Sequence, residues 1–78
     1  MSEKPYVHVY PESLFRWWVT FTPAGELAFL HERVYLRYGK KRAVRHGERL
    51  LREASGGTLH LSDKAPWAPG ANSEKYAV

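Results

Sequence analysis

The clearest hydrophobic pattern in the chain runs from Lys40 to Ala54, where apolar residues recur every three or four positions. This spacing predicts an α-helix, because it gathers the apolar side chains on one side of a helix with 3.6 residues per turn. The predicted inner face holds Lys40, Ala43, Val44, Gly47, Leu50, Leu51 and Ala54. The opposite face holds Lys41, Arg42, Arg45, Arg49 and Arg52. We therefore expect one face to pack on a core and the other to form a cationic surface.

Glycines occur at one place within this helix and at a second place just after it. Gly47 lies within the apolar face, where glycine costs about 1 kcal/mol relative to alanine. We expect it to admit an aromatic ring from a sheet, because the chain has three Trp, three Phe and five Tyr. Gly56 and Gly57 follow the helix and are expected to supply its left-handed C-terminal stop.

Alternation of apolar and polar residues predicts strands on both sides of the helix. The predicted strands are Tyr6 to Tyr10, Phe15 to Phe21 and Thr58 to Ser62. Directly after the second of these strands, Thr22-Pro23-Ala24-Gly25 is typical of a type I turn that returns the chain into a hairpin. The next segment, residues 26–36, fits either a strand or a helix. Its aromatic and β-branched residues favour a strand for at least Leu27 to His31.

These elements predict a single α+β domain over residues 6–62, with a three- or four-stranded, mostly antiparallel sheet and one amphipathic helix packed on one face. Residues 1–5 are expected to be frayed, and residues 63–78 to form a Pro- and Gly-containing tail that is extended or disordered. In that tail, Trp67 and Tyr76 are candidates to dock on the domain or on a partner. The predicted core is Val7, Val9, Trp17, Val19, Phe21, Val44, Leu50, Leu51, Leu59 and Leu61.

Positive charge is concentrated in one part of the chain. Residues 37–54 contain seven of the twelve Lys and Arg against two Glu, a local charge of +5 compared with +4 for the whole 78-residue chain. Such a concentration is the electrostatic pattern of an anion or nucleic-acid binder, although a merely solvated helix face has the same composition.

The sheet face away from the helix is a second candidate surface. It is predicted to carry Tyr6, His8, Tyr10, Arg16, Trp18, Thr20 and His60, with His31, Arg33 and Tyr35 as further candidates. Aromatic rings interleaved with cations suit a single-stranded nucleic acid, because every base has a π face that can stack. They equally suit a homodimer formed between two such sheet faces.

The sequence lacks the motifs of common catalytic and metal chemistry. Without cysteine, the chain has no disulfide, no thiolate zinc site and no cysteine nucleophile. The four histidines form no HxxxH, HxH or HExxH pattern, and His8 with His60 offers at most a cross-strand pair for a metal or a pH response. We expect no enzymatic activity, no metal and no cofactor. No apolar run approaches 18 residues, so we expect a soluble, cytoplasmic protein with no membrane partner.

Several short motifs carry a resemblance to a known family. His8, Val9 and Pro11, then Trp17 or Trp18, then a helix with Ala43 and Ala54, then Leu59 to Asp63, follow one another in this order. The chain thereby resembles a widespread family of short bacterial and phage domains of unassigned function with a strand, strand, helix, strand layout. The match covers residues 6–63 and departs from the family in an insertion over residues 27–38 and in the arginine density of the helix. It implies a fold and leaves function open.

Two functions are consistent with these patterns. In the first, the protein binds nucleic acid, with phosphates contacting Lys41, Arg42, Arg45, Arg49 and Arg52 and bases stacking on Trp18, Tyr6 or Tyr10. In the second, it is a protein-interaction module, either a homodimer through the aromatic sheet face or a phage-type adaptor or inhibitor that presents its basic helix to an acidic host protein.

Overall fold

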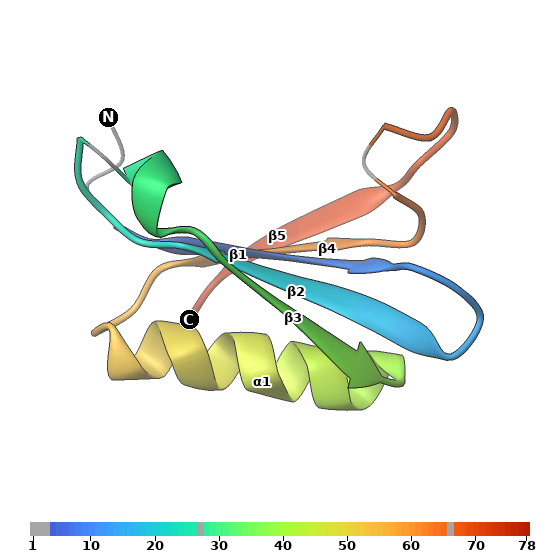
Figure 1. The fold of residues 1–78 in the computed structure, drawn as a ribbon, viewed down its shortest axis with the longest axis horizontal. Coiled ribbons are helices and arrows are strands. Elements are labelled where there is room, and N and C mark those ends of the chain that lie inside the picture. Colours follow the sequence, from blue (N-terminus) through green and yellow to red (C-terminus); the bar gives the residue numbers. More distant parts are fainter. Residues whose placement is uncertain (1–3, 27, 66) are drawn as a thin grey trace.

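A computed structural model describes residues 4–26, 28–65 and 67–78 of the chain. Five strands and one α-helix account for most of these residues (Figure 1). In chain order the elements are β1 (Tyr6–Pro11), β2 (Arg16–Thr22), the 3₁₀ helix η1 (Ala28–His31), β3 (Arg33–Tyr38), α1 (Lys40–Glu53), β4 (Thr58–Ser62) and β5 (Ser73–Ala77). Within the described ranges, no helix is long and apolar enough to cross a membrane.

The five strands form one sheet in the order β3-β2-β1-β4-β5. Strand β1 pairs in parallel with β4, and the three other pairs are antiparallel. Helix α1 lies along one face of this sheet and leaves the other face open, as Figure 1 shows. The predicted arrangement of a sheet with one helix on a single face is therefore confirmed.

The core lies between α1 and the central strands. Its fully buried residues are Val7, Val9, Val19, Ala43, Leu51 and Leu59. Partly buried residues that pack against them are Trp17, Phe21, Tyr35, Val44, Leu50, Leu61, Tyr76 and Val78. All ten predicted core residues belong to these two groups. Burial of this apolar surface is the main favourable contribution to folding, at about 25 cal/mol per Å² removed from water.

The strand count and the sheet type differ from the sequence prediction of three or four mostly antiparallel strands. The sheet has five strands and is mixed, because β1 and β4 run parallel. The additional strand β5 lies in residues 63–78, which the sequence assigned to a tail. Its residues alternate only weakly in polarity. It forms because β4 has a free edge to which it can add, with Tyr76 opposite Leu59.

Residues 26–36 also differ from the prediction. The prediction of a strand at Leu27 to His31 was wrong, because Ala28–His31 form η1. Leu27 itself lies outside the described residues. The strand begins later, at Arg33, and pairs with β2 as the hairpin signal required. The register with β2 sets the faces: Arg33 lies opposite Phe21 and Tyr35 opposite Val19, so both are on the helix side of the sheet rather than on the open side.

The helix ends in a different manner from the prediction. Ser55, with φ of 69°, is the first left-handed residue after the helix, and Gly56 follows with φ of 104°. The Gly56 N–H donates to the Leu51 carbonyl at 2.7 Å, and the Ser55 N–H donates to the Arg52 carbonyl at 3.1 Å. This pair of bonds is a Schellman motif, in which the left-handed position usually belongs to glycine.

Two other expectations need correction. Gly47 is buried, but it faces the aliphatic side chains of Val7, Leu59 and Val9 and not an aromatic ring. Of the residues expected to be frayed, Pro5 is buried, and its carbonyl accepts a hydrogen bond from the Thr58 N–H at 3.2 Å. Residues 1–3 lie outside the described part of the chain.

Candidate functional site

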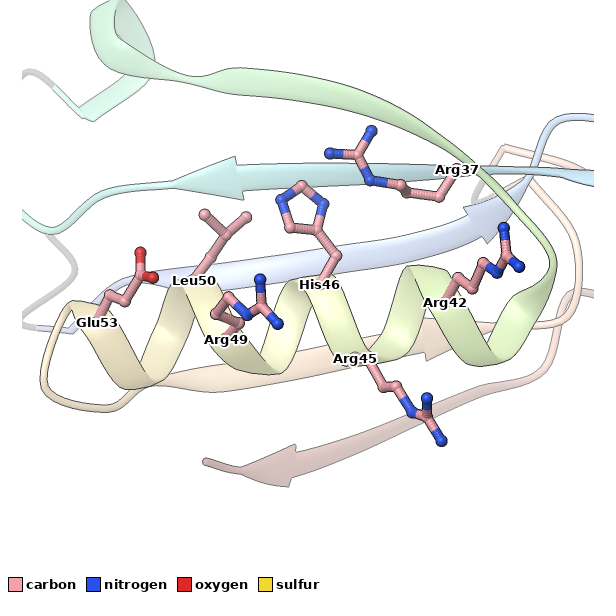
Figure 2. A pocket seen from close by; sticks show the side chains of 7 residues that line it. All are labelled: Arg37, Arg42, Arg45, His46, Arg49, Leu50 and Glu53. Carbon is pink, nitrogen blue, oxygen red and sulfur yellow. The ribbon is translucent and has the colours of Figure 1, made fainter.

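A groove runs between α1 and the edge strand β3. The helix packs mainly over β1 and β2, so the helix-facing side chains of β3 are only partly covered. The space beside them has a volume of about 420 Å³ and is open to solvent. We call this space the basic groove; its lining residues are Arg37, Arg42, Arg45, His46, Arg49, Leu50 and Glu53 (Figure 2).

Two elements supply the cations of the basic groove. Arg42, Arg45 and Arg49 are three and four residues apart on α1, a spacing that keeps side chains on one side of a helix. Arg37 comes from β3, where its position opposite Trp17 places it on the helix side of the sheet. Figure 2 shows Arg37 and His46 close together above the helix, whereas the Arg45 side chain points to the opposite side of the helix in this view.

Arg37 is held in place by its neighbours. Its guanidinium donates a hydrogen bond to the Leu36 carbonyl at 2.9 Å. It also lies 5.6 Å from the centroid of the Tyr35 ring, within the range of a cation–π contact. These contacts orient one positive charge toward the groove.

His46 forms the uncharged part of the lining. Its ring packs edge-to-face on Tyr35, with centroids 4.6 Å apart, and its Nδ1 is buried without a hydrogen-bond partner in the described part of the chain. Burial is the main cause that lowers the pKa of His46 below its usual value of 6.5, and Arg37 and Arg49 lower it further, while Glu53 opposes them. The imidazole is thus neutral at neutral pH.

The charge of the groove is weakly compensated. Across residues 4–26, 28–65 and 67–78, the guanidinium groups of Arg42, Arg45 and Arg49 make no ion pair. Glu53 is the single acidic residue in the lining, against four arginines. Since guanidinium groups bind carboxylates and phosphates through two parallel N–H bonds, the groove is chemically suited to an anionic ligand.

The structure places the predicted helix residues in three positions. Arg42, Arg45 and Arg49 line the basic groove. Lys41 lies with Lys40, Val44 and Leu61 around a neighbouring hollow that shares Arg45. Arg52 is exposed and does not line the groove. Sequence reasoning missed Arg37 and His46 as groove residues. The alternation of Arg33, Tyr35 and Arg37 would have pointed to Arg37 had these residues been assigned to the helix side of the sheet.

The open face of the sheet carries a continuous row of rings. Tyr6 and His60 are 5.6 Å apart between centroids, His60 and His8 5.7 Å, His8 and Tyr10 5.2 Å, and Tyr10 and Trp67 5.6 Å. Trp67 is 77% exposed and extends the row beyond the sheet. Trp18 lies on the same face, opposite Tyr10, but is partly buried. The rings contact one another at an angle rather than lying flat and parallel.

His8 and His60 are directly opposite each other on β1 and β4, as the sequence predicted. The Nε2 of His8 is 2.9 Å from the Ser62 hydroxyl. Burial, and secondarily the proximity of His60, lower the pKa of His8; burial and Lys75 lower that of His60. Among the described residues, no group of three or more His, Asp or Glu is arranged to hold a metal ion.

The two candidate surfaces lie on opposite sides of the sheet. Tyr6, Tyr10 and Trp18 share the open face, since Tyr10 pairs with Trp18 and Tyr6 with Thr22, whereas α1 covers the face of Val7 and Val9. A ligand in the basic groove therefore does not reach those rings directly. The predicted residues do not form one continuous site.

Fold and groove together define a small α+β protein with a solvent-open cationic groove beside an edge strand. Comparisons with protein-family models, with curated proteins and with solved structures give no match to this chain. The assignment of function consequently depends on the site alone.

Proposed function

We propose that this chain is a non-enzymatic protein that binds the phosphate backbone of nucleic acid in the basic groove. The observation that carries the proposal is that four arginines, from β3 and α1, line one open groove with a single acidic residue. Non-specific affinity for nucleic acid arises mainly from such phosphate contacts and the counterions they release.

The length of the arginine row suits a polyanion better than a single small anion. Arg42 to Arg49 span seven residues of helix, which is about 10 Å at 1.5 Å per residue. Over that distance a DNA duplex presents about six negative charges, at one charge per 1.7 Å. Several phosphates can then be contacted at once. The groove offers no Asn or Gln for reading adenine, so backbone contact is favoured over sequence recognition.

Stacking on Tyr6, Tyr10 or Trp18 is a separate part of the proposal. Because these rings lie on the open face, a nucleic acid would have to pass around the edge of the sheet to use them. Binding in the groove does not require this. Such a protein would act in the cytoplasm.

The test is a titration of labelled single-stranded and duplex oligonucleotides followed by fluorescence anisotropy. Arg49→Gln removes a groove arginine, and Arg52→Gln, on the same helix but outside the groove, is the matched control. We expect Arg49→Gln to weaken binding by about tenfold and Arg52→Gln by much less. If four phosphates are neutralised, the plot of log K against log salt concentration should have a slope of about −3.6 for duplex and −2.8 for single strands.

Equal losses in the two variants would show a diffuse helix surface rather than a groove. Absence of binding by the unmodified protein at low salt would overturn the proposal. In that case the basic helix would face an acidic protein, or the open sheet face a second copy, as in the alternative interaction function.

A further inference from the structure

Strand β3 is an edge of the sheet, and on its outer side no other described strand pairs with its backbone. The Gly39 N–H donates to the Phe15 carbonyl at 2.8 Å, so the backbone of residue 39 is directed toward β2. Backbone direction alternates along a strand, so Arg33, Tyr35 and Arg37 also face β2. The N–H and carbonyl groups of Val34, Leu36 and Tyr38 therefore point to the free edge. In agreement, the Leu36 carbonyl accepts its hydrogen bond from the Arg37 side chain.

The side chains on this edge are apolar on the open face of the sheet. Val34 is 56% exposed and Tyr38 63% exposed, and Leu36 lies between them. On the same face the other edge strand, β5, instead carries the charged Lys75 between Ser73 and Ala77. The exposed Arg33 of β3 lies on the helix side. Charged residues protect an edge from further pairing, whereas an apolar edge strand invites it. The two edges of the sheet thus differ, and β3 is the one suited to accept another strand.

We propose that a second copy of this chain pairs with β3 in antiparallel fashion, centred on Leu36. In this register Leu36 is opposite Leu36 of the second copy, and Val34 is opposite Tyr38, so the exposed apolar side chains cover one another. On the helix side, Tyr35 is opposite Arg37, the two residue types that already make a cation–π contact within one chain. The strand is therefore complementary to itself.

The neighbouring register is less favourable. Residues directly opposite in an antiparallel pair lie on the same face, so the nearest other two-fold registers are centred on Tyr35 and on Arg37. The first would place Arg33 opposite Arg37 and the second Arg37 opposite Arg37, and like charges directly opposite are destabilising. In the register centred on Leu36, the N–H of Leu36 in each copy replaces the Arg37 side chain as donor to the Leu36 carbonyl.

Pairing in this way would bring the two basic grooves together. A two-fold axis perpendicular to the sheet keeps both helices on the same face, and each groove lies between α1 and the strand at that axis. Arg37 of each copy would then line one shared channel between two rows of helix arginines. This consequence rests on the proposed function. The strand pairing does not, and it is opposed by the +4 charge of each chain, so it should strengthen with added salt.

Cysteine cross-linking without nucleic acid tests the pairing and its register. The chain has no cysteine, so Leu36→Cys introduces its single thiol. Opposite Cα atoms in a hydrogen-bonded antiparallel pair are about 5.5 Å apart, within the reach of a disulfide. Residue 34 of one copy would lie more than 10 Å from residue 34 of the other, at about 3.4 Å per residue along the strand. Val34→Cys is therefore the matched control on the same edge, and Lys75→Cys the control on the other edge.

With diamide as oxidant at high salt, Leu36→Cys should form several times more covalent dimer than Val34→Cys or Lys75→Cys. A yield no higher than in both controls would overturn the proposal. Sedimentation equilibrium gives a second readout that needs no thiol. Leu36→Pro removes an N–H directed to the free edge. Lys75→Pro does the same on β5, because the hydrogen bonds between Val78 and Gly57 direct the backbone of residue 78 toward β4 and therefore that of residue 75 toward the free edge.

We expect the unmodified protein and Lys75→Pro to show a concentration-dependent dimer, and folded Leu36→Pro to remain a monomer. A monomeric unmodified protein at every concentration and salt would also overturn the pairing. Neither experiment contains nucleic acid, so a negative result for the strand pairing is distinct from a failure of the proposed function.

Discussion

Gly47 of α1 lies so close to Val7 of β1 that a Cβ at position 47 would come within 2.8 Å of the Val7 Cγ1. The same Cβ would approach the Leu59 Cδ1 to 3.2 Å. Both neighbours are fully buried and have little room to move. The absence of a side chain at Gly47 is what lets the helix settle onto β1 and β4, the two central parallel strands.

Gly47→Ala should therefore destabilise the protein by about 1 kcal/mol. Overpacking a filled core costs about 1–3 kcal/mol, and the gain in helix propensity of about 1 kcal/mol offsets only part of it. Urea denaturation followed by circular dichroism measures the change. In a Val7→Ala background, where the obstructing methyl groups are gone, the same substitution should become neutral or stabilising. A Gly47→Ala variant more stable than the unmodified protein would contradict this packing.

Gly57→Ala should destabilise the folded protein more than Gly47→Ala, by about 3 kcal/mol. A Cβ at position 57 would clash with the Pro5 carbonyl oxygen, a backbone atom that cannot rotate away, and would approach the Leu51 Cδ2 to 2.7 Å. That carbonyl also accepts the hydrogen bond from the Thr58 N–H, so a shift would disturb the start of the β1–β4 pairing. Thermal denaturation of Gly57→Ala and Gly47→Ala side by side should give the lower Tm for Gly57→Ala.

Ser55→Gly is expected to stabilise the protein by about 0.5–1 kcal/mol. Ser55 has φ of 69°, a conformation that costs residues with a side chain about 1 kcal/mol and glycine almost nothing. Ser55→Ala keeps a Cβ and removes only the hydroxyl, so it serves as the control and should not stabilise. A Ser55→Gly variant with an unchanged or lower midpoint in urea would show that the left-handed residue is not a source of strain.

Stability should fall as the pH is lowered from 7.5 to 5. The pKa values of His8, His46 and His60 are all lowered in the folded protein from the usual 6.5. In this range the unfolded chain binds more protons than the folded chain, which favours unfolding as the pH decreases. The contribution of these three histidines to the stability of the folded protein is fully present above pH 6.5 and is lost progressively below it.

The double variant His8→Gln/His60→Gln tests the origin of this pH dependence. Its Tm should fall less between pH 7.5 and pH 5 than that of the unmodified protein, because two of the three histidines no longer titrate. His46, which retains its burial and its neighbours Arg37 and Arg49, should preserve part of the decrease. An identical decrease in the variant and the unmodified protein would show that these two histidines are not responsible.

The sequence by itself determined the elements whose side-chain period is strong. Helix α1 begins at Lys40 as predicted and ends one residue before the predicted Ala54, because its apolar positions repeat at the helical period over four turns. Strands β1, β2 and β4 alternate clearly, so their inward residues Val7, Val19 and Leu59 were correctly assigned to the core. The same alternation assigned His8 and His60 to the open face, whereas their pairing also depends on β4 lying beside β1.

Only the tertiary structure decided the edges of the sheet and the groove. Strand β5 has little hydrophobic pattern and is held by the free edge of β4 and by the Tyr76 hydroxyl, which donates to Glu48 at 3.1 Å. Strand β3 begins only after η1, and its register with β2 turns Tyr35 and Arg37 toward the helix. Arg37 thereby joins arginines of α1 that follow it closely in sequence but belong to another layer. A side-chain period identifies which face of an element is apolar, whereas the position of an edge strand and the meeting of charges from two layers depend on how those layers pack.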